Sequence, residues 1–267
     1  MRQGPRFTLI GRQNESRKLT SAISKRESLL VWGPTDAGKT SLTKMVIGGL
    51  PEVDRRNCIY WTGGASVRQL VAELVRGLYV AGDTLVRNKV RQDGCGESSL
   101  NRWLREQTSG RLKVLLYSAA KAGRYWVFLD HFPAATQTMA GFLKEIIWRC
   151  KTPVYLLARG CSHTEIGYAW SIYYTPQYHI SLGPLPDGSA RELLEQCIQR
   201  FGLGTLDLQG FREDMLRLSH HIPGRIVKMS EMAADARYQY GDQVKVGLIH
   251  VDYLMSAGIP NGRSGPH

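Results

Sequence analysis

The sequence lacks any long apolar run, and no stretch approaches the ~20 residues that a membrane-spanning helix needs. Its first residues, MRQGPRFTLI, also lack the apolar segment of a secretory signal. Cysteine is scarce, at positions 58, 95, 150, 161 and 197, and no two cysteines form a CxxC pair. This pattern argues against a disulfide framework and against a zinc site. We therefore expect a soluble, cytoplasmic protein that does not act at a membrane.

Acidic residues are scarce in the first half of the chain. The 267 residues carry a net charge of +12. Residues 1–130 hold 22 Lys and Arg against 11 Asp and Glu, whereas residues 131–267 hold 13 against 12. Such asymmetry is typical of a surface that faces a polyanion such as nucleic acid, although many basic soluble domains bind none. Charge alone allows both interpretations.

Apolar runs alternate with helical patterns, which predicts an α/β fold with a five-stranded parallel sheet. The expected strands cover 28–33, 57–62, 124–130, 152–158 and 177–182. The expected helices cover 13–25, 38–48, 66–79, 98–122 (as two helices) and 137–150.

After the fifth expected strand, the segment GPLPDG predicts a loop, and Asp187 can cap a helix over 187–202. The following residues, to about 236, also have a helical pattern. We therefore expect an α/β core over 1–183, a small helical lid over 184–255, and a polar tail over 256–267.

The segment from Gly33 to Thr40, GPTDAGKT, matches the phosphate-loop pattern GxxxxGK[ST] and follows an expected strand directly. Glycines let the backbone N–H groups turn toward phosphate oxygens, Lys39 reaches the β- and γ-phosphates, and Thr40 binds Mg²⁺. The residues expected around the phosphates are Gly33, Pro34, Thr35, Asp36, Ala37, Gly38, Lys39, Thr40 and Ser41.

Asp130 ends the apolar run WVFLD, as the second acidic element of phosphate-loop proteins does, where it holds Mg²⁺ through water. No NKxD motif for reading guanine is present. The sequence therefore predicts ATP and Mg²⁺ as ligands, with Thr40 and Asp130 on the metal.

With these motifs, the chain resembles the AAA+ ATPases, and the resemblance covers nearly all of it. It is most similar to the branch that holds initiator and origin-recognition ATPases, STAND switch ATPases and transposition regulators. The segment from Phe7 to Glu15 matches F-x-GR-x-x-E, and about 95 residues separate the phosphate loop from Asp130. The segments HISLGPLPDGSARELL and HHIPGRIVKM resemble the start of the family's lid and its sensor segment.

The resemblance implies further site residues. Gly11 and Arg12 would line the adenine pocket, and Arg159, after the fourth strand, would sense the γ-phosphate. Pro223 and Arg225 would form the second sensor, although the motif is shifted here. These roles compete with plainer ones, because Arg12 can form an ion pair at a helix start and Pro-Gly is ordinary turn chemistry.

The resemblance also implies a homo-oligomer in which one subunit supplies an arginine to its neighbour's ATP. Arg149, before the fourth strand, is the candidate, and it would neutralise charge on the transferred phosphoryl group. The alternative role is a cation that stabilises a helix C-terminus.

His131 stands where the family has its catalytic glutamate, and the next acidic residue is Glu145. A neutral imidazole can accept a proton, but its geometry differs from that of a carboxylate. We therefore expect slow or partner-dependent ATP hydrolysis, with Lys39, Asp130, His131, Arg149 and Arg159 in the catalytic set.

For a partner, the sequence favours DNA, with a protein recruited or regulated there. Arg87, Lys89 and Arg91 alternate in VRNKVRQ and would share a face in an extended loop. The alternative is a STAND-like switch that acts on a protein without DNA, since no helix-turn-helix follows the lid. A small-molecule kinase would leave the lid and sensor segments without a role.

Overall fold

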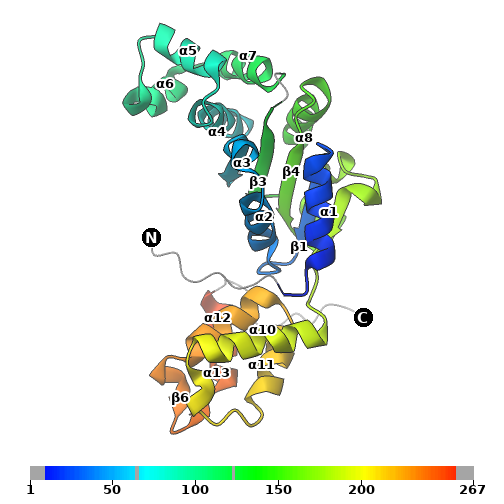
Figure 1. Cartoon of the computed structure of the whole chain (residues 1–267), viewed down its shortest axis with the longest axis vertical. Helices are drawn as coiled ribbons and strands as arrows, with labels where there is room; N and C mark the ends of the chain where they lie inside the picture. The colour runs from blue at the N-terminus through cyan, green and yellow to red at the C-terminus, as the bar shows by residue number, and fades with distance from the viewer. Residues whose placement is uncertain (1–9, 64–65, 122–123, 257–267) are drawn as a thin grey trace. The chain divides into compact units, whose positions relative to one another are not determined.

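The structure is a computed structural model that describes residues 10–63, 66–121 and 124–256 (Figure 1). The chain forms two compact units. The larger unit comprises Asn14–Thr35 and Lys39–Leu182, and the smaller comprises Met1–Gln13, Asp36–Gly38 and Gly183–His267. The start of the F-x-GR-x-x-E segment at Phe7 and the tail after Ser256 lie outside the described residues.

The larger unit is built on a parallel sheet with the strand order β2-β3-β4-β1-β5. Its strands are β1 (Leu29–Gly33), β2 (Cys58–Thr62), β3 (Trp126–Phe132), β4 (Val154–Arg159) and β5 (His179–Ser181). They form where apolar runs allow burial on both faces of a sheet. The predicted fold class and all five strands are confirmed, each to within two residues at either end.

Helices flank the sheet in the larger unit. They are α1 (Gln13–Ser24), α2 (Lys39–Gly48), α3 (Glu52–Arg56), α4 (Val67–Val80), α5 (Thr84–Gln92), α6 (Leu100–Glu106), α7 (Ser109–Ala120), α8 (Gln137–Lys144) and α9 (His163–Ile166). A π-helical turn, η2 (Glu145–Arg149), continues α8, and 3₁₀ turns lie at η1 (Glu97–Ser99), η3 (Tyr168–Ser171) and η4 (Pro176–Tyr178). The prediction did not include α3, α5 or α9.

Helices α4 to α7 group at one end of the larger unit, beside β2 and β3 (Figure 1). The apolar stripe of α4 carries Leu70, Leu74 and Leu78, all at most 1% exposed, and packs with Leu129 of β3 in one core. These three leucines recur every four residues, so they lie on one face of α4, and that face packs into the core.

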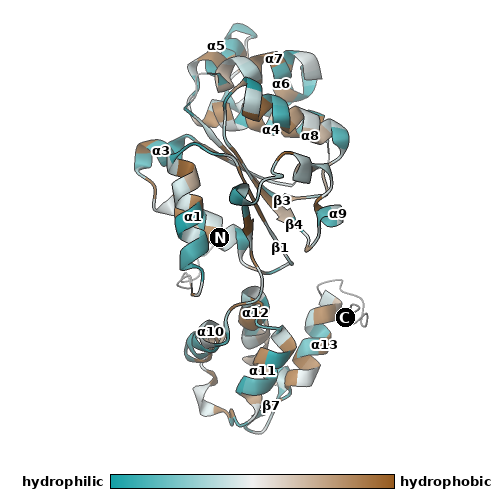
Figure 2. Cartoon of the chain, turned by 90° about the vertical axis from the view of Figure 1, so that its right-hand side faces the viewer, coloured by the Kyte–Doolittle hydropathy of each residue, from teal (hydrophilic) through white to brown (hydrophobic). Residues whose placement is uncertain are grey.

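The smaller unit is helical, with α10 (Asp187–Arg200), α11 (Phe211–Ser219), α12 (Pro223–Ala233) and α13 (Val246–Ser256). It also contains the 3₁₀ turns η5 (Leu203–Thr205) and η6 (Ala236–Tyr238) and the hairpin of β6 (Gln239–Tyr240) and β7 (Gln243–Val244). Residues such as Met215, Ile226 and Ile249, all fully buried, form its core. Helices α10 and α11 have hydrophobic and hydrophilic sides, as amphipathic helices do (Figure 2). Helix α13 differs, because Leu248, Val251 and Met255 are exposed while Ile249 and Tyr253 are buried.

One expectation for this unit is wrong. Asp187 does not cap α10, because the helix already includes it and its Oδ2 instead accepts a hydrogen bond from Arg191 Nε at 2.8 Å. Helical structure reaches η6 near residue 236, as the pattern predicted, and the hairpin and α13 follow it. No helix among the described residues is both long and apolar enough to cross a bilayer.

The packing of α4 against β2 gives a testable contrast between two helical glycines. A Cβ on Gly77 of α4 would overlap the side chain of Ile59, whereas a Cβ on Gly141 of α8 would meet nothing. Alanine gains about 1 kcal/mol over glycine inside a helix, and overpacking costs ~1–3 kcal/mol. We expect Gly77→Ala to destabilise the protein and Gly141→Ala to stabilise it by up to about 1 kcal/mol. Urea unfolding followed by circular dichroism tests this, and equal effects of the two changes would contradict the packing.

Candidate functional site

The predicted phosphate loop joins β1 to α2 at the carboxyl end of the sheet. The backbone at Gly33 has φ +148°, and a Cβ there would overlap the carbonyl oxygen of Leu182. Gly38 has φ +92°. L-residues rarely adopt these angles, so both positions of the motif need glycine. Between and beyond them, Thr35 and Ser41 are exposed, Ala37 is buried and Pro34 is half-buried.

Lys39 begins α2 and is only 8% exposed. Its Nζ donates hydrogen bonds to the carbonyl oxygens of Gly33, at 2.7 Å, and Pro34, at 2.8 Å. A buried ammonium needs polar partners, and here the loop itself supplies them. The cation is thus held at the mouth of the loop, where an anion can compete for its three protons.

Asp130, 1% exposed, lies next to α2 and accepts three hydrogen bonds. Its Oδ2 accepts from Thr40 Oγ1 at 2.7 Å and from the Tyr60 hydroxyl, and its Oδ1 accepts from the backbone N–H of His131 at 2.7 Å. The structure therefore brings together the loop threonine and the strand aspartate that the sequence predicted as metal ligands.

Tyr60 of β2 is a site residue that sequence reasoning missed. Desolvation, and then its hydrogen bond to Asp130, raise the pKa of this phenol, which keeps it a neutral donor. The pairing of Thr62 with Asp130 places the end of β2 beside this edge. The sequence signal that could have identified it is its position, two residues before the end of β2, the strand that pairs with the strand of Asp130.

A hydroxyl and a carboxylate are oxygen ligands of the kind that Mg²⁺ prefers. The part of the chain that the structure describes holds no group of three or more His, Cys, Asp or Glu side chains able to bind a metal. A divalent ion at Thr40 and Asp130 would therefore take its other ligands from water and phosphate, which is how Mg²⁺ is usually held.

His131 has the left-handed angle φ +53°, at a point where the register between β3 and β4 shifts. Its side chain is 47% exposed, and its Nδ1 lies 3.0 Å from an Nη2 of Arg159. Because arginine only donates, Nδ1 accepts this bond and the neutral ring carries its proton on Nε2. The bulge thus turns the imidazole toward the end of β4.

Lys39, Thr40, Asp130, His131 and Arg159 therefore meet at the carboxyl edge of the sheet. Arg149 does not. It is exposed in η2, which precedes β4, and so lies toward the amino edge.

In the smaller unit, Gly11 has φ +68°, and a Cβ there would come within 2.7 Å of Ser189. Arg12 is 6% exposed and donates to the carbonyl oxygen of Gly183. Pro223 opens α12, where its missing N–H costs nothing. Arg225, half-buried on α12, has an Nε that makes no hydrogen bond to any described residue.

Asp36, which belongs to the smaller unit with Ala37 and Gly38, makes contacts that the sequence did not predict. Its carboxylate accepts from Lys228 Nζ at 3.0 Å and from the Tyr253 hydroxyl at 2.7 Å. Its carbonyl oxygen accepts from the N–H of Gly224 at 2.8 Å. Burial would raise the pKa of Asp36, but the bonds from Tyr253 and Lys228 outweigh it and lower the pKa.

The expected DNA contacts are placed differently from the prediction. Arg87, Lys89 and Arg91 lie on helix α5, not on an extended loop, so Lys89 does not share a face with the other two, whereas Arg87 and Arg91, four residues apart, do. Arg87 Nε donates to the carbonyl oxygen of Tyr79 at 3.0 Å, and Lys89 pairs with Asp93 at 2.9 Å. Helix-favouring residues after the cap of Asp83 explain the error.

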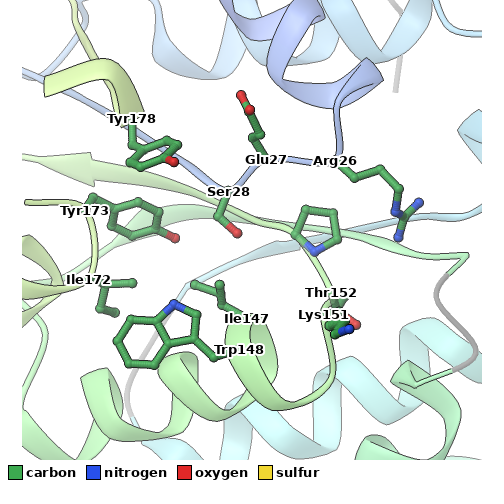
Figure 3. A pocket seen from close by; sticks show the side chains of 11 residues that line it. Arg26, Glu27, Ser28, Ile147, Trp148, Lys151, Thr152, Ile172, Tyr173 and Tyr178 are labelled. Atoms are coloured by element: carbon green, nitrogen blue, oxygen red, sulfur yellow. The ribbon is translucent and has the colours of Figure 1, made fainter. Parts of the chain in front are cut away.

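A hollow of about 300 Å³ lies at the opposite, amino edge of the sheet (Figure 3). Ser28 before β1, Pro153 before β4, and Trp148 of η2 line it. Ligands of open parallel sheets bind beyond the carboxyl ends of the strands, so this hollow is not the counterpart of the phosphate loop.

No family model and no curated protein matches the sequence. Among solved structures, the chain is similar to the Walker-type ATPase of Pyrococcus abyssi, with 17% identity, a TM-score of 0.57, and coverage of 93% of this chain and 72% of that one. A second match, the Pif1 helicase of Candida albicans, has 13% identity, a TM-score of 0.35 and coverage of 78% and 47%, and is too distant to carry an argument. The first similarity shows that the chain has the fold of a Walker-type, phosphate-loop ATPase.

The depressed pKa of Asp36 predicts how its contacts depend on pH. A carboxylate with a lowered folded pKa stabilises the protein above its unfolded pKa, near 3.9, and this contribution is lost as pH falls through the folded value. Asn tolerates the φ of +65° at this position, so Asp36→Asn removes the charge without straining the backbone. We expect a lower urea midpoint than wild type at pH 7 and pH 5 and a shrinking difference below about pH 4. If the difference in urea midpoint between wild type and Asp36→Asn stays constant from pH 7 to below about pH 4, that result would contradict the contact between Asp36 and Lys228.

Proposed function

We propose that this chain binds ATP with Mg²⁺ and hydrolyses it slowly, as a regulatory ATPase. The observation that carries the proposal is the hydrogen bond between Thr40 Oγ1 and Asp130 Oδ2, set directly beside the buried Lys39. Thr40 gives its one proton to Asp130, which leaves the lone pairs of Oγ1 for a metal. A plain glycine turn would need neither this pair nor a buried lysine.

In this proposal each residue has a definite task. The loop N–H groups and Lys39 hold the β- and γ-phosphates, and Lys39 exchanges the carbonyl oxygens of Gly33 and Pro34 for phosphate oxygens. Thr40 and Asp130 would hold Mg²⁺, which would supply positive charge against the negative charge that develops on the transferred phosphoryl group. Tyr60 fixes the Asp130 carboxylate, so its free lone pairs keep one orientation toward the metal's water shell.

Slow hydrolysis is supported by the orientation of His131. The Nδ1 lone pair accepts a bond from Arg159, and the proton on Nε2 leaves that atom unable to act as a base. The ring must therefore break its bond to Arg159 before it can accept a proton from water. The same bond engages Arg159, the candidate γ-phosphate sensor.

The finer proposal is that the chain is an AAA+ regulator of the initiator and transposition-regulator type. In it, oligomerisation on DNA brings Arg149 to a neighbour's ATP and a protein partner is recruited or regulated. The excess of basic residues before Asp130 supports the DNA contact. The alternative, a STAND-like switch acting on a protein, is favoured by Trp148, 59% exposed beside the hollow of Figure 3, since exposed aromatics often mark protein interfaces.

Lys39→Ala tests the nucleotide site. We expect ATP binding to be lost, because no other side chain of the loop carries a positive charge to the phosphates. An equilibrium titration with a fluorescent ATP analogue measures this. Lys25→Ala, an exposed lysine after α1, is the control that removes the same charge elsewhere. If Lys39→Ala retains wild-type affinity, the phosphate-loop assignment is wrong.

His131→Glu tests the cause of slow turnover. We expect ATP hydrolysis to rise while ATP affinity stays unchanged, because a positioned general base contributes ~10²–10⁴-fold. The left-handed φ of residue 131 disfavours glutamate, so the gain will fall at or below the lower end of this range.

The measurement is steady-state turnover with duplex DNA, at protein concentrations high enough to assemble subunits. His131→Asn is the matched control, since asparagine tolerates φ of +53° and supplies no base. If the wild type is already fast and both variants are slower, His131 is a working base and the proposed slow switch is wrong.

A further inference from the structure

A groove of about 450 Å³ runs between α4 and α6 in the larger unit. Its lining is polar and mostly basic, and consists of Arg68, Gln69, Ala72, Glu73, Arg76, Asn101, Leu104 and Arg105. Three guanidinium groups face a single carboxylate, and two side-chain amides add neutral donors. The groove is separate from the edge that holds Lys39 and Asp130.

Arg68 is a fixed part of this groove. Its Nη2 donates to the carbonyl oxygens of Leu104 and Arg105, both at 3.1 Å, near the C-terminus of α6. Those carbonyls lack helical partners and carry partial negative charge, so they hold the guanidinium in one orientation. Its Nη1 is buried and has no hydrogen-bond partner among the described residues.

Arg76 and Arg105 extend the basic lining along the two helices. Arg76 Nη1 pairs with Glu73 at 3.2 Å, whereas its Nε is buried and makes no hydrogen bond to any described residue. Arg105 is exposed and its Nε donates to the carbonyl oxygen of Asn101 at 3.3 Å, which leaves its terminal nitrogens available. A buried N–H without an acceptor costs ~1–3 kcal/mol, and two of the arginines that line the groove each carry one such group.

We infer that this groove binds phosphates of the DNA backbone. Phosphate is the acceptor-rich anion that a set of guanidinium forks fits best, and a groove lined on two sides suits consecutive phosphates of a strand. The surrounding segment 66–121 holds ten Lys and Arg against five Asp and Glu, which adds long-range attraction. The inference rests on the DNA-binding part of the proposed function and moves the contact from α5 to α4 and α6.

The test is the salt dependence of binding to a labelled duplex of about 20 base pairs, followed by fluorescence anisotropy from about 50 to 200 mM salt. The groove variant is Arg76→Gln with Arg105→Gln, which spares Arg68 because that residue caps α6. The control variant is Arg191→Gln with Arg217→Gln on α10 and α11. Each of those arginines also pairs with a carboxylate of its own helix, and the control changes the net charge equally.

We expect the groove variant to bind more weakly and its slope of log K against log salt to fall by about two, since each phosphate contact contributes ~0.9. The control should keep the wild-type slope. If the two variants give equal slopes, only the total charge of the protein affects binding. That result would overturn the groove assignment but not DNA binding itself.

A wild type that binds ATP but no duplex would overturn both the groove and the DNA-binding part of the proposed function. A duplex RNA of the same sequence is the second arm, and binding to it at least tenfold tighter than to DNA would overturn the assignment to DNA. A melting curve and an ATP titration of the groove variant establish that it is folded with an intact nucleotide site. If the melting temperature or the ATP affinity of the groove variant drops, the single change Arg105→Gln replaces it, with Arg217→Gln as its control. The slope for Arg105→Gln is then expected to change by about one, and the slope for Arg217→Gln to stay at the wild-type value.

Discussion

The carboxylate of Asp130 is the constraint on which the proposed site depends. A buried carboxylate must be hydrogen-bonded or paired, and this one obtains its partners from three different elements. Thr40 belongs to α2, Tyr60 to β2, and the N–H of His131 to the bulge of β3. Satisfying one charge therefore fixes the start of the phosphate-loop helix, the edge of the sheet and the backbone at position 131 together.

The bulge at His131 lies directly beside this carboxylate. The N–H of His131 donates to Oδ1 of the preceding aspartate, and the backbone of His131 itself has the left-handed φ of +53°, which costs a non-glycine residue about 1–2 kcal/mol. That turn directs the imidazole to Arg159 instead of along the strand. The geometry at 131 thus comes from the backbone, and changing the side chain alone does not restore the path of a regular strand. Strain held at such a position is typical of functional sites.

Sequence alone predicted the strands and the phosphate loop because both have strong local signals, an apolar run and a fixed spacing of glycines. It failed where the decisive contact is distant. The residues near Asp36 give no sign of its contact with Lys228, 192 residues away. Tyr60 lies 70 residues from Asp130, and its position near the end of a strand points to Asp130 only once the pairing of β2 with β3 is known. It also failed at α5, since alternation of charge over seven residues fits an extended segment as well as a helix until the cap at Asp83 is considered.

Net charge, too, has to be corrected for internal contacts before it describes a surface. Arg124 pairs with the buried Asp83, Arg68 bonds to carbonyl oxygens of α6, and Arg87 bonds to one of α4. A guanidinium that satisfies a backbone carbonyl keeps its charge but loses donors and freedom to move. The excess of basic residues within residues 1–130 therefore supplies a long-range attraction for a polyanion. Directional contacts to a polyanion can come only from arginines with unused nitrogens, and the terminal nitrogens of Arg105 meet this condition in the groove between α4 and α6.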